Sequence, residues 1–597
     1  MSEEIEHNCG VAAVVLLRDA QDSQKYPYGV LPKLRQLMRV NQPRGRDGAG
    51  ILTIREGRVD ERIISEGPVE RLFHAYTKTG LRGFLERYNC QSALGHNRYT
   101  TSGNDDERLL QPWLHNDPHQ YSRFGFCFNG NIANWREVRT LLEEIGNYEF
   151  SLNIDTEVLE MMLRHELRAF NPRKKETLEQ KLREGTLQSD ETLARAFLEN
   201  LSEREKGEQE WKDIFYHLAN VLDGGWTLAL ARSDPEKQGE FVFARDAHGL
   251  RPGYYSIDER RGIFAFSSES AGLESILPRG KMRELPPGHI LRVYRGQVEG
   301  PVDFTRGILT ERSPCFLEDF YFQHVNTRAS GEGSHPMTNY DVRYRAGQLM
   351  AENDPLREIV QRFDTAVVGV PNAALAFTEG LAEGLGLSAR QNIVKFDSGR
   401  TFTNDSDNGD RGIPEAYSFS STLRGKRIIL ADDSIVRLNT LPEIIARIYL
   451  LDPSEIHIRI GTPPIVGICP YGINIRTLDE LSAVPFEQEF RRMKPEGSID
   501  EMIKHIEQKM IFEIERRARR ILKETYELSD EEIERPIVAS LRYLSHENLD
   551  ESYRKVETID GVKETDFDGK LCRGCITGRY PTKAGQRLYD AQRTKRE

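Results

Sequence analysis

The sequence lacks several features that mark membrane, secreted and nucleic-acid-binding proteins. None of its 597 residues lies in a run of about 18 apolar residues, which excludes an ordinary transmembrane helix. Its first residues, MSEEIEHN, have neither the basic start nor the apolar stretch of a secretory signal. The net charge of −12 offers no cationic surface for nucleic acid or an anionic membrane. We therefore expect a cytoplasmic protein.

Cysteine is also scarce. The chain has seven cysteines, and an odd number in a reducing compartment argues against a disulfide framework. The pattern of apolar segments instead predicts an α/β protein. Short apolar strands fill residues 9–305, apart from a charged, helix-forming insertion at about 170–215. Strands and helices alternate within 306–485, which favours a parallel sheet, and 486–597 holds a helical insertion and a C-terminal segment.

Cys9 is the first candidate for chemistry. A thiol at a chain terminus lies beside its own α-amino group, whose pKa is near 8, so that amine can accept the thiol proton. This requires removal of residues 1–8 as a propeptide. Taken alone, Cys9 is more simply read as a small core residue. Three further segments favour the catalytic interpretation. Arg98 can clamp a carboxylate, Asn129 with the Gly130 N–H can form an oxyanion hole, and Asp155 can hold an ammonium group.

These segments, in this order, resemble class II glutamine amidotransferases, which are N-terminal-nucleophile hydrolases. The matching runs are CGV, RGRDGAG, GHNRYTTSG, NGN and DTE. The resemblance implies a four-layer αββα domain with Cys9 as nucleophile. It also implies that Arg98 binds the glutamine carboxylate and Asp155 the amine, with Arg44 and Tyr99 lining or closing the pocket. Phe128 stands where the family commonly has His.

Nearly the whole chain resembles the phosphoribosylpyrophosphate amidotransferases. The later matches are RDAHGLRP, SSES, PPG, VRYRAGQ, GRTF and DDSIVR. From the residues alone, two acids after a strand usually mark a capped helix start. The resemblance implies instead a type I phosphoribosyltransferase loop that binds phosphoribosyl pyrophosphate with Mg²⁺. The residues that it assigns to this site are Lys395, Asp432, Asp433, Ser434, Arg437, Asn439 and Thr440.

This half also departs from the family. Leu438 replaces a glycine, and its side chain could obstruct the phosphate or force a different loop. Pro371-Asn372-Ala373 replaces Pro-Glu-Ser, and an acidic, polar stretch, TNDSDNGDRGIPEAYS, replaces a basic flexible loop. Either the phosphoribosyl chemistry persists with an altered loop, or the second domain serves another ammonia acceptor or a regulatory role.

Four of the cysteines match a third pattern. The C-x-x-C pair Cys572 and Cys575 could bind metal, act in redox chemistry or be incidental. The family's iron–sulfur branch has cysteines at these positions and at Cys315 and Cys469, so the resemblance implies a [4Fe–4S] cluster of structural role. Zinc is the main rival.

The expected function is therefore glutamine hydrolysis with transfer of ammonia to phosphoribosyl pyrophosphate, giving 5-phosphoribosylamine. The resemblance also implies homo-oligomers and inhibition by purine nucleotides. A glutaminase with another acceptor, or a non-catalytic iron–sulfur protein, are the alternatives.

Overall fold

The computed structural model describes residues 9–17, 26–74, 80–99, 107–115, 123–146, 148–207, 209–233, 239–307, 311–330, 337–360, 364–396, 417–554 and 570–596. Residues 1–8, which are expected to form a propeptide, lie outside this part of the chain, as do residues 397–416 and 100–106. Within it, no helix is long and apolar enough to cross a membrane.

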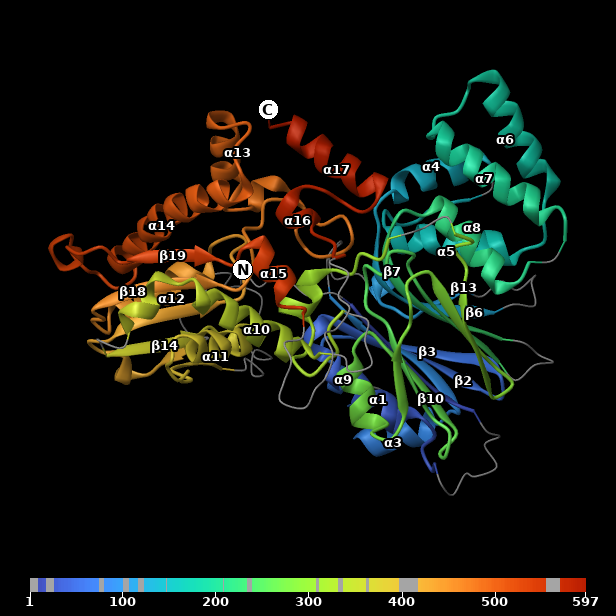
Figure 1. Ribbon diagram of the computed structural model, residues 1–597. Coiled ribbons are helices and arrows are strands. Elements are labelled where there is room, and N and C mark those ends of the chain that lie inside the picture. Colours follow the sequence, from blue (N-terminus) through green and yellow to red (C-terminus); the bar gives the residue numbers. More distant parts are fainter. Residues whose placement is uncertain are drawn as a thin grey trace.

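Two antiparallel sheets form the centre of the first half of the molecule (Figure 1). The strand order in the seven-stranded sheet is β11-β9-β10-β1-β4-β2-β3. Its strands are β1 Gly10–Leu16, β2 Gly48–Arg55, β3 Arg58–Glu66, β4 Ser92–Arg98, β9 Tyr254–Asp258, β10 Ile263–Ser267 and β11 Lys281–Glu284. The order in the six-stranded sheet is β13-β12-β8-β7-β6-β5. Its strands are β5 Trp113–His115, β6 Phe124–Ile132, β7 Gly224–Arg232, β8 Glu240–Arg245, β12 His289–Tyr294 and β13 Gln297–Asp303.

Helices cover the outer faces of both sheets. One apolar cluster joins the seven-stranded sheet to α1 Leu31–Val40, α2 Val69–His74, α3 Gly80–Arg87 and α9 Ser270–Ile276. A second joins the six-stranded sheet to α4 Trp135–Glu144, α5 Asp155–Leu167, α6 Pro172–Glu184, α7 Glu191–Arg204 and α8 Trp211–Val221. A third cluster lies between the sheets and contains Val11, Ala13 and Cys127. The expected four-layer αββα arrangement is confirmed.

β1 alternates its side chains between two of these clusters. Ala12 and Val14 face the helices, whereas Val11 and Ala13 face the other sheet. A strand buried on both faces needs an uninterrupted apolar run, which GVAAVVL provides. This burial holds the residue before the strand, Cys9, in a defined place.

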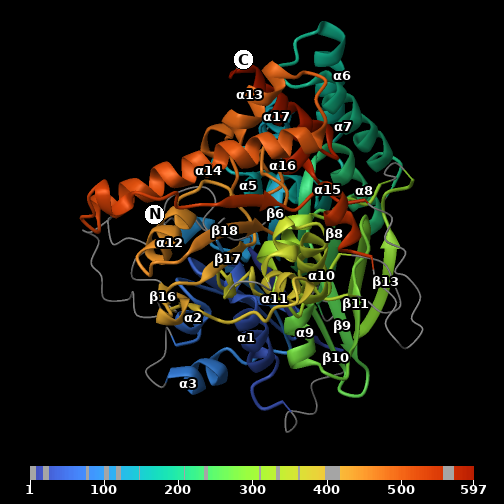
Figure 2. The same cartoon turned by 60° about the vertical axis from the view of Figure 1, so that its left-hand side comes forward.

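The second half contains a parallel sheet in the order β14-β17-β18-β19. Its strands are β14 Thr365–Gly369, β17 Arg427–Asp432, β18 Glu455–Ile460 and β19 Ser540–Tyr543, and the short pair β15 Ile393–Lys395 and β16 Tyr417–Phe419 lies apart from it. The helices are α10 Asn339–Glu352, α11 Leu375–Gly384, α12 Thr440–Tyr449, α13 Val484–Met493, α14 Ile499–Glu524 and α15 His546–Glu551. α14 and α11 lie on opposite sides of the sheet (Figure 2), which confirms the expected parallel α/β unit.

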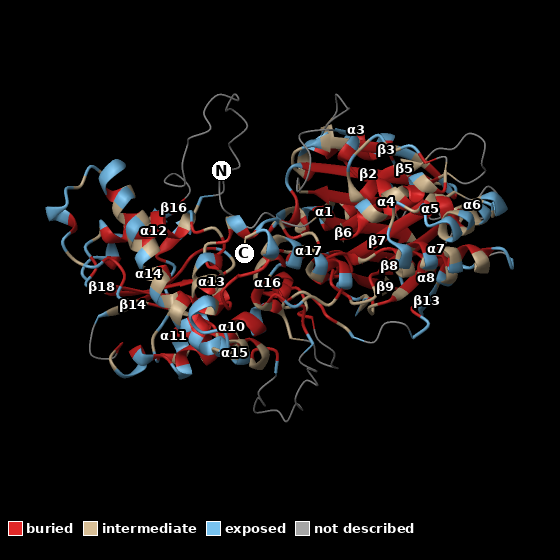
Figure 3. Cartoon of the chain, turned by 90° about the horizontal axis from the view of Figure 1, so that it is seen from above, coloured by how far each residue is buried: buried red, intermediate tan, exposed pale blue. Residues whose placement is uncertain are grey.

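The C-terminal segment joins the two halves through α16 Gly574–Thr577 and α17 Lys583–Thr594. The backbone N–H of Ala584 donates to the Asp223 carboxylate at 2.8 Å, and the Tyr471 and Thr582 hydroxyls lie 3.0 Å apart. Buried residues fill most strands of both halves (Figure 3), whereas the edge strands β11 and β13 are largely exposed. The two sets of elements are thus tied together by the end of the chain.

Candidate functional site

Cys9 lies directly before β1, partly buried, and charged residues from three other segments act on it. Its thiol is 3.9 Å from the carbonyl oxygen of Tyr99, and Arg44 Nε donates to the Cys9 carbonyl at 3.3 Å. Burial raises the pKa of the Cys9 thiol, while the charges of Arg98 and Arg44 act to lower it and Asp155 to raise it. A thiol held in its neutral form needs a nearby base before it can act as a nucleophile.

Strand β6 brings the predicted oxyanion residues to this point. Asn129 is buried, and its Nδ2 lies 3.4 Å from the Ser268 hydroxyl, which also accepts from the Val11 N–H at 3.0 Å. Asn129 is therefore tied to the strand that follows Cys9. Gly130 has φ +153°, and a Cβ there would lie 2.1 Å from the Gly225 carbonyl oxygen. Only glycine fits this position.

The two residues predicted to hold the ends of glutamine come to the same place. Arg98 ends β4 and Asp155 begins α5, and both influence the pKa of Cys9. Burial raises the pKa of Asp155 to about 6, although its carboxylate accepts the Ile132 N–H at 3.1 Å. A cation and an anion so placed suit the carboxylate and ammonium groups of an α-amino acid.

Arg44 is fully buried and does not reach toward open space. Its guanidinium pairs with Glu269 at 3.2 Å and with Glu318 at 3.0 Å, and these carboxylates raise its pKa against the effect of burial. Its contact with the Cys9 carbonyl makes it a support for the nucleophile. Most of the loop after Tyr99 lies outside the described residues, so the closing role of Tyr99 stays a prediction.

The acidic pair of the second half stands at the carboxyl end of β17. The Asp433 N–H donates to Asp432 Oδ1 at 2.9 Å, and the Ser434 hydroxyl donates to Asp433 at 2.8 Å. Burial and the neighbouring carboxylate raise the pKa of Asp432 well above its usual value, and burial raises that of Asp433 to about 6. A divalent cation with oxygen ligands would relieve this repulsion and let both ionise.

Leu438 does not obstruct this loop. Its φ is +61°, the left-handed conformation that a glycine would adopt, and its side chain is only 3% exposed within the apolar core. Arg517 donates to its carbonyl at 2.8 Å. The loop between Asp433 and the start of α12, which includes Asn439 and Thr440, thus keeps a glycine-like turn although the residue is leucine.

Two residues predicted to bind the phosphoribosyl group, Arg437 and Lys395, contact other side chains in the structure. Arg437 donates to Glu480 at 2.8 Å and to the Asn474 carbonyl at 2.7 Å, so its charge is already paired. Lys395 ends β15, with its ammonium group 6.0 Å from the centre of the Tyr417 ring. The GRTF run and most of the acidic stretch after it lie outside the described residues.

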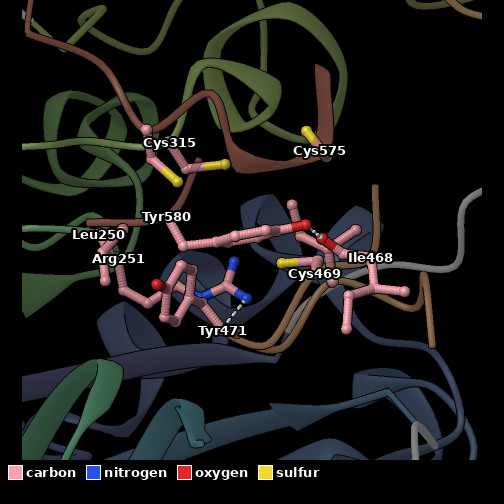
Figure 4. Close-up of a pocket in the computed structure, with 10 residues that line it drawn as sticks. Leu250, Arg251, Cys315, Ile468, Cys469, Tyr471, Cys575 and Tyr580 are labelled. Atoms are coloured by element: carbon pink, nitrogen blue, oxygen red, sulfur yellow. Dashed lines mark hydrogen bonds between the residues drawn. The ribbon is translucent and has the colours of Figure 1, made fainter. Parts of the chain in front are cut away.

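The four predicted metal ligands line a single small buried cavity, with Leu250, Arg251, Ile468, Tyr471, Ile473 and Tyr580 (Figure 4). The Cys572 N–H donates to the Pro314 carbonyl at 2.8 Å, which places the C-x-x-C segment against Cys315. Burial raises the pKa of all four thiols. In the part of the chain that is described, no three His, Cys, Asp or Glu side chains already stand as a metal site. Four thiols around one cavity are nevertheless the donor set that iron–sulfur clusters and structural zinc use.

Several residues of these sites were not assigned from the sequence. Ser268 and Glu269 lie in SSES, Arg251 in RDAHGLRP, and Glu318 three residues after Cys315. The first two segments carried the family resemblance, but the spacing of their residues gave no sign of a role. The partners of Glu318 lie 274 and 67 residues away in the chain.

Comparison with known proteins finds relatives of one kind, although no family model matches the chain. Amidophosphoribosyltransferase 1, chloroplastic, of Arabidopsis thaliana is 27% identical over 446 residues, covering 74% of this chain and 66% of that protein. The amidophosphoribosyltransferase of Methanocaldococcus jannaschii is 25% identical over 596 residues, covering 96% of this chain and 98% of that protein. That of Bacillus subtilis is 25% identical, covering 74% and 78%. The chain is thus similar in sequence to several proteins named amidophosphoribosyltransferase.

Solved structures of this enzyme type share the fold. The glutamine phosphoribosylpyrophosphate amidotransferase from B. subtilis, complexed with ADP and GMP, has a TM-score of 0.66 and 22% identity, covering 97% of this chain and 98% of that one. The structure of "the allosteric regulatory enzyme of purine biosynthesis" has a TM-score of 0.65 and 21% identity, covering 97% and 99%. The expected resemblance and fold are confirmed.

Proposed function

We propose that the protein is a glutamine-dependent amidotransferase that passes ammonia to phosphoribosyl pyrophosphate and forms 5-phosphoribosylamine, the first step of purine synthesis. One observation carries the first half of this proposal. Cys9, Arg98 and Asp155 come from three separate segments, and the charges of Arg98 and Asp155 both act on the Cys9 thiol. The thiol lies 3.9 Å from the carbonyl oxygen of Tyr99, the residue after Arg98, and the Asp155 carboxylate accepts from the N–H of Ile132 at the end of β6, the strand of Asn129 and Gly130. The names of the relatives support the phosphoribosyl acceptor and do not favour the alternative of another acceptor or a regulatory role.

In the glutaminase step, Arg98 holds the glutamine carboxylate and Asp155 its ammonium group. After removal of residues 1–8, the free amine of Cys9 takes the thiol proton, and the sulfur attacks the amide carbon. Asn129 Nδ2 and the Gly130 N–H donate to the oxyanion that forms. The Cys9 amine passes the proton it took to the leaving nitrogen, and the oxyanion collapses with loss of ammonia to leave a thioester. Water then attacks the thioester, which releases glutamate and restores the thiol.

In the transfer step, ammonia displaces pyrophosphate from phosphoribosyl pyrophosphate. Asp432 and Asp433 would hold the ribose hydroxyls or Mg²⁺, which neutralises charge on the pyrophosphate. The backbone N–H groups of the loop from Ser434 to Thr440 would cradle the 5′-phosphate, with α12 behind them. The inward side chain of Leu438 supports this reading, since it leaves the cradle open. We assign Asn439 and Lys395 to this site as well. Arg437 belongs to it too, but its pairing with Glu480 would make it a support of the loop rather than a free positive charge for the substrate.

We further propose that Cys315, Cys469, Cys572 and Cys575 hold a [4Fe–4S] cluster, whose bonds would tie the C-terminal segment to the body. The same thiols could take zinc, and the metal content of the purified protein separates the two. We divide the chain into a glutaminase domain over 9–305, a phosphoribosyltransferase-like domain over 306–485, and a C-terminal region over 486–597. This last region supplies β19 to the parallel sheet of the second domain and two of the four cysteines. We also propose that the protein is a cytoplasmic homo-oligomer that purine nucleotides inhibit.

The proposal is tested by comparing the protein with its Cys9→Ala variant under two ammonia sources. The wild type should release pyrophosphate with either glutamine or ammonium chloride, whereas the variant should respond to ammonium chloride alone. A variant that still releases glutamate from glutamine would show that Cys9 is not the nucleophile.

A further inference from the structure

A chain of buried charged side chains connects the nucleophile with the cysteine cavity. It begins at the Cys9 carbonyl, which accepts from Arg44 Nε at 3.3 Å. Arg44 donates to both oxygens of Glu318 at 3.0 Å, and Arg251 donates to the same carboxylate at 2.8 Å. Arg251 Nε in turn donates to the Tyr471 carbonyl at 2.8 Å. Arg44, Glu318 and Arg251 are each at most 1% exposed.

These hydrogen-bonded residues come from different parts of the molecule. Cys9, Arg44 and Arg251 belong to the first half, whereas Glu318 and Tyr471 follow the cavity cysteines Cys315 and Cys469 by three and two residues. Figure 4 shows Arg251 beside Tyr471 on the floor of that cavity. Glu318 is therefore a carboxylate that the second half of the chain inserts between two arginines of the first half.

The charges of these buried side chains balance only when Glu318 is present. Two guanidinium groups face two carboxylates, those of Glu318 and Glu269, in a region without exposure. Removing one buried partner leaves an uncompensated charge, which is far more costly than the net value of the pair. Without Glu318, Arg44 would retain only Glu269 and would shift toward it or toward water.

A second contact carries the same coupling to the oxyanion strand. Asn131 Nδ2 donates to the Pro470 carbonyl at 2.6 Å, and a Cβ at Gly472 would lie 3.1 Å from the Gly130 carbonyl carbon. The segment that Arg251 holds at Tyr471 thus packs directly on the residue after Asn129. Both parts of the glutaminase site, the nucleophile and the oxyanion strand, are thus held by contacts with residues of the second half.

We propose that Glu318 is a positioning residue through which the second half of the chain holds Cys9 in its reactive orientation. The inference rests on the proposed glutaminase function. Glu318 does not contact glutamine, so its loss should slow the attack without weakening binding, because Arg98 and Asp155 hold the substrate. The first half alone would lack a competent nucleophile.

The test uses the full-length Glu318→Gln and Glu318→Asp variants, with Asp354→Asn as the matched control. Asp354 is also a buried carboxylate paired with an arginine, Arg459, but both residues belong to the second half. We measure kcat and KM for glutamate release, and pyrophosphate release with ammonium chloride, which bypasses Cys9. The rate of Cys9 alkylation by iodoacetamide gives a readout that is independent of turnover.

Glu318→Gln should lower kcat roughly 10–100-fold, the loss that a displacement of about 1 Å brings, and leave KM for glutamine little changed. Cys9 alkylation should change in rate, Glu318→Asp should recover part of kcat, and ammonia-dependent pyrophosphate release should persist. Asp354→Asn should keep its kcat for glutamate release.

Three results would overturn the inference. These are an unchanged kcat in Glu318→Gln, an equal loss of the glutamine- and ammonia-dependent rates, or an effect of Asp354→Asn on kcat as large as that of Glu318→Gln. If Glu318→Gln does not fold, Glu318→Asp and Arg251→Lys must still lower kcat selectively, or the inference fails. A wild type that releases no glutamate would instead refute the proposed function.

Discussion

Leu438 is the position at which a substitution tests the phosphoribosyl half most directly. Its backbone is left-handed at φ +61°, and its side chain is 3% exposed in the core. Replacing it with glycine therefore has two opposed effects. It removes the cost of a left-handed L-residue, about 1–2 kcal/mol, and it removes a buried leucine, whose loss costs about 3–5 kcal/mol.

The net effect of Leu438→Gly is a loss of about 2 kcal/mol of stability, taking about 3 kcal/mol for the lost leucine and about 1 kcal/mol for the relieved strain. At about 2–4 °C per kcal/mol, this lowers the thermal midpoint of a unit of this size by about 4–8 °C. Leu438→Ala loses a similar apolar volume but keeps most of the strain. The alanine variant should therefore be the less stable of the two, the reverse of the usual order in regular structure.

Thermal unfolding of the two variants tests the predicted stabilities, and phosphoribosyl pyrophosphate kinetics test whether the side chain obstructs the phosphate. Because the side chain points into the core, KM for phosphoribosyl pyrophosphate should change by less than about threefold in Leu438→Gly, since tenfold would need about 1.4 kcal/mol of contact. A large fall in KM would mean that leucine obstructs the phosphate. An alanine variant more stable than the glycine variant would refute the strain argument.

Three further predictions concern the other sites. Since the raised pKa of Asp155 is about 6 and only its ionised form pairs with an ammonium group, KM for glutamine should rise as pH falls below 6, and Asp155→Asn should remove that dependence. Gly130→Ala places a Cβ 2.1 Å from a carbonyl oxygen and displaces one oxyanion donor, so glutamate release should fall roughly 10²–10³-fold while ammonia-dependent turnover remains; an unchanged rate would remove Gly130 from the mechanism. Cys572→Ser should lower the iron content and the thermal midpoint of anaerobically purified protein together, and an unaltered iron content would exclude this cysteine as a ligand.

Local patterns in the sequence were enough to predict the elements that carry the site. The apolar run GVAAVVL predicted β1, which the structure buries on both faces. The apolar run in KRIILADD predicted β17, which ends at Asp432, the first residue of the acidic pair. Such patterns depend on neighbours along the chain, and they also placed the strand of Asn129.

The partners of buried charges could not be predicted in this way. Arg44 was expected to line the glutamine pocket, but its carboxylates, Glu269 and Glu318, lie 225 and 274 residues further along the chain. The pairing of Arg437 with Glu480 likewise depends on tertiary packing. For Leu438, the sequence could show only that glycine was missing, because the direction of the side chain depends on a backbone angle that composition does not determine.

We infer that one chain couples glutamine hydrolysis to pyrophosphate displacement. The most direct test of this inference follows glutamate and pyrophosphate in parallel, in anaerobically purified protein given glutamine, Mg²⁺ and phosphoribosyl pyrophosphate. We expect equal release of both products, and mass spectrometry of that active protein should find Cys9 as its first residue. Glutamate without pyrophosphate, or activity in a chain that still begins at Met1, would contradict it.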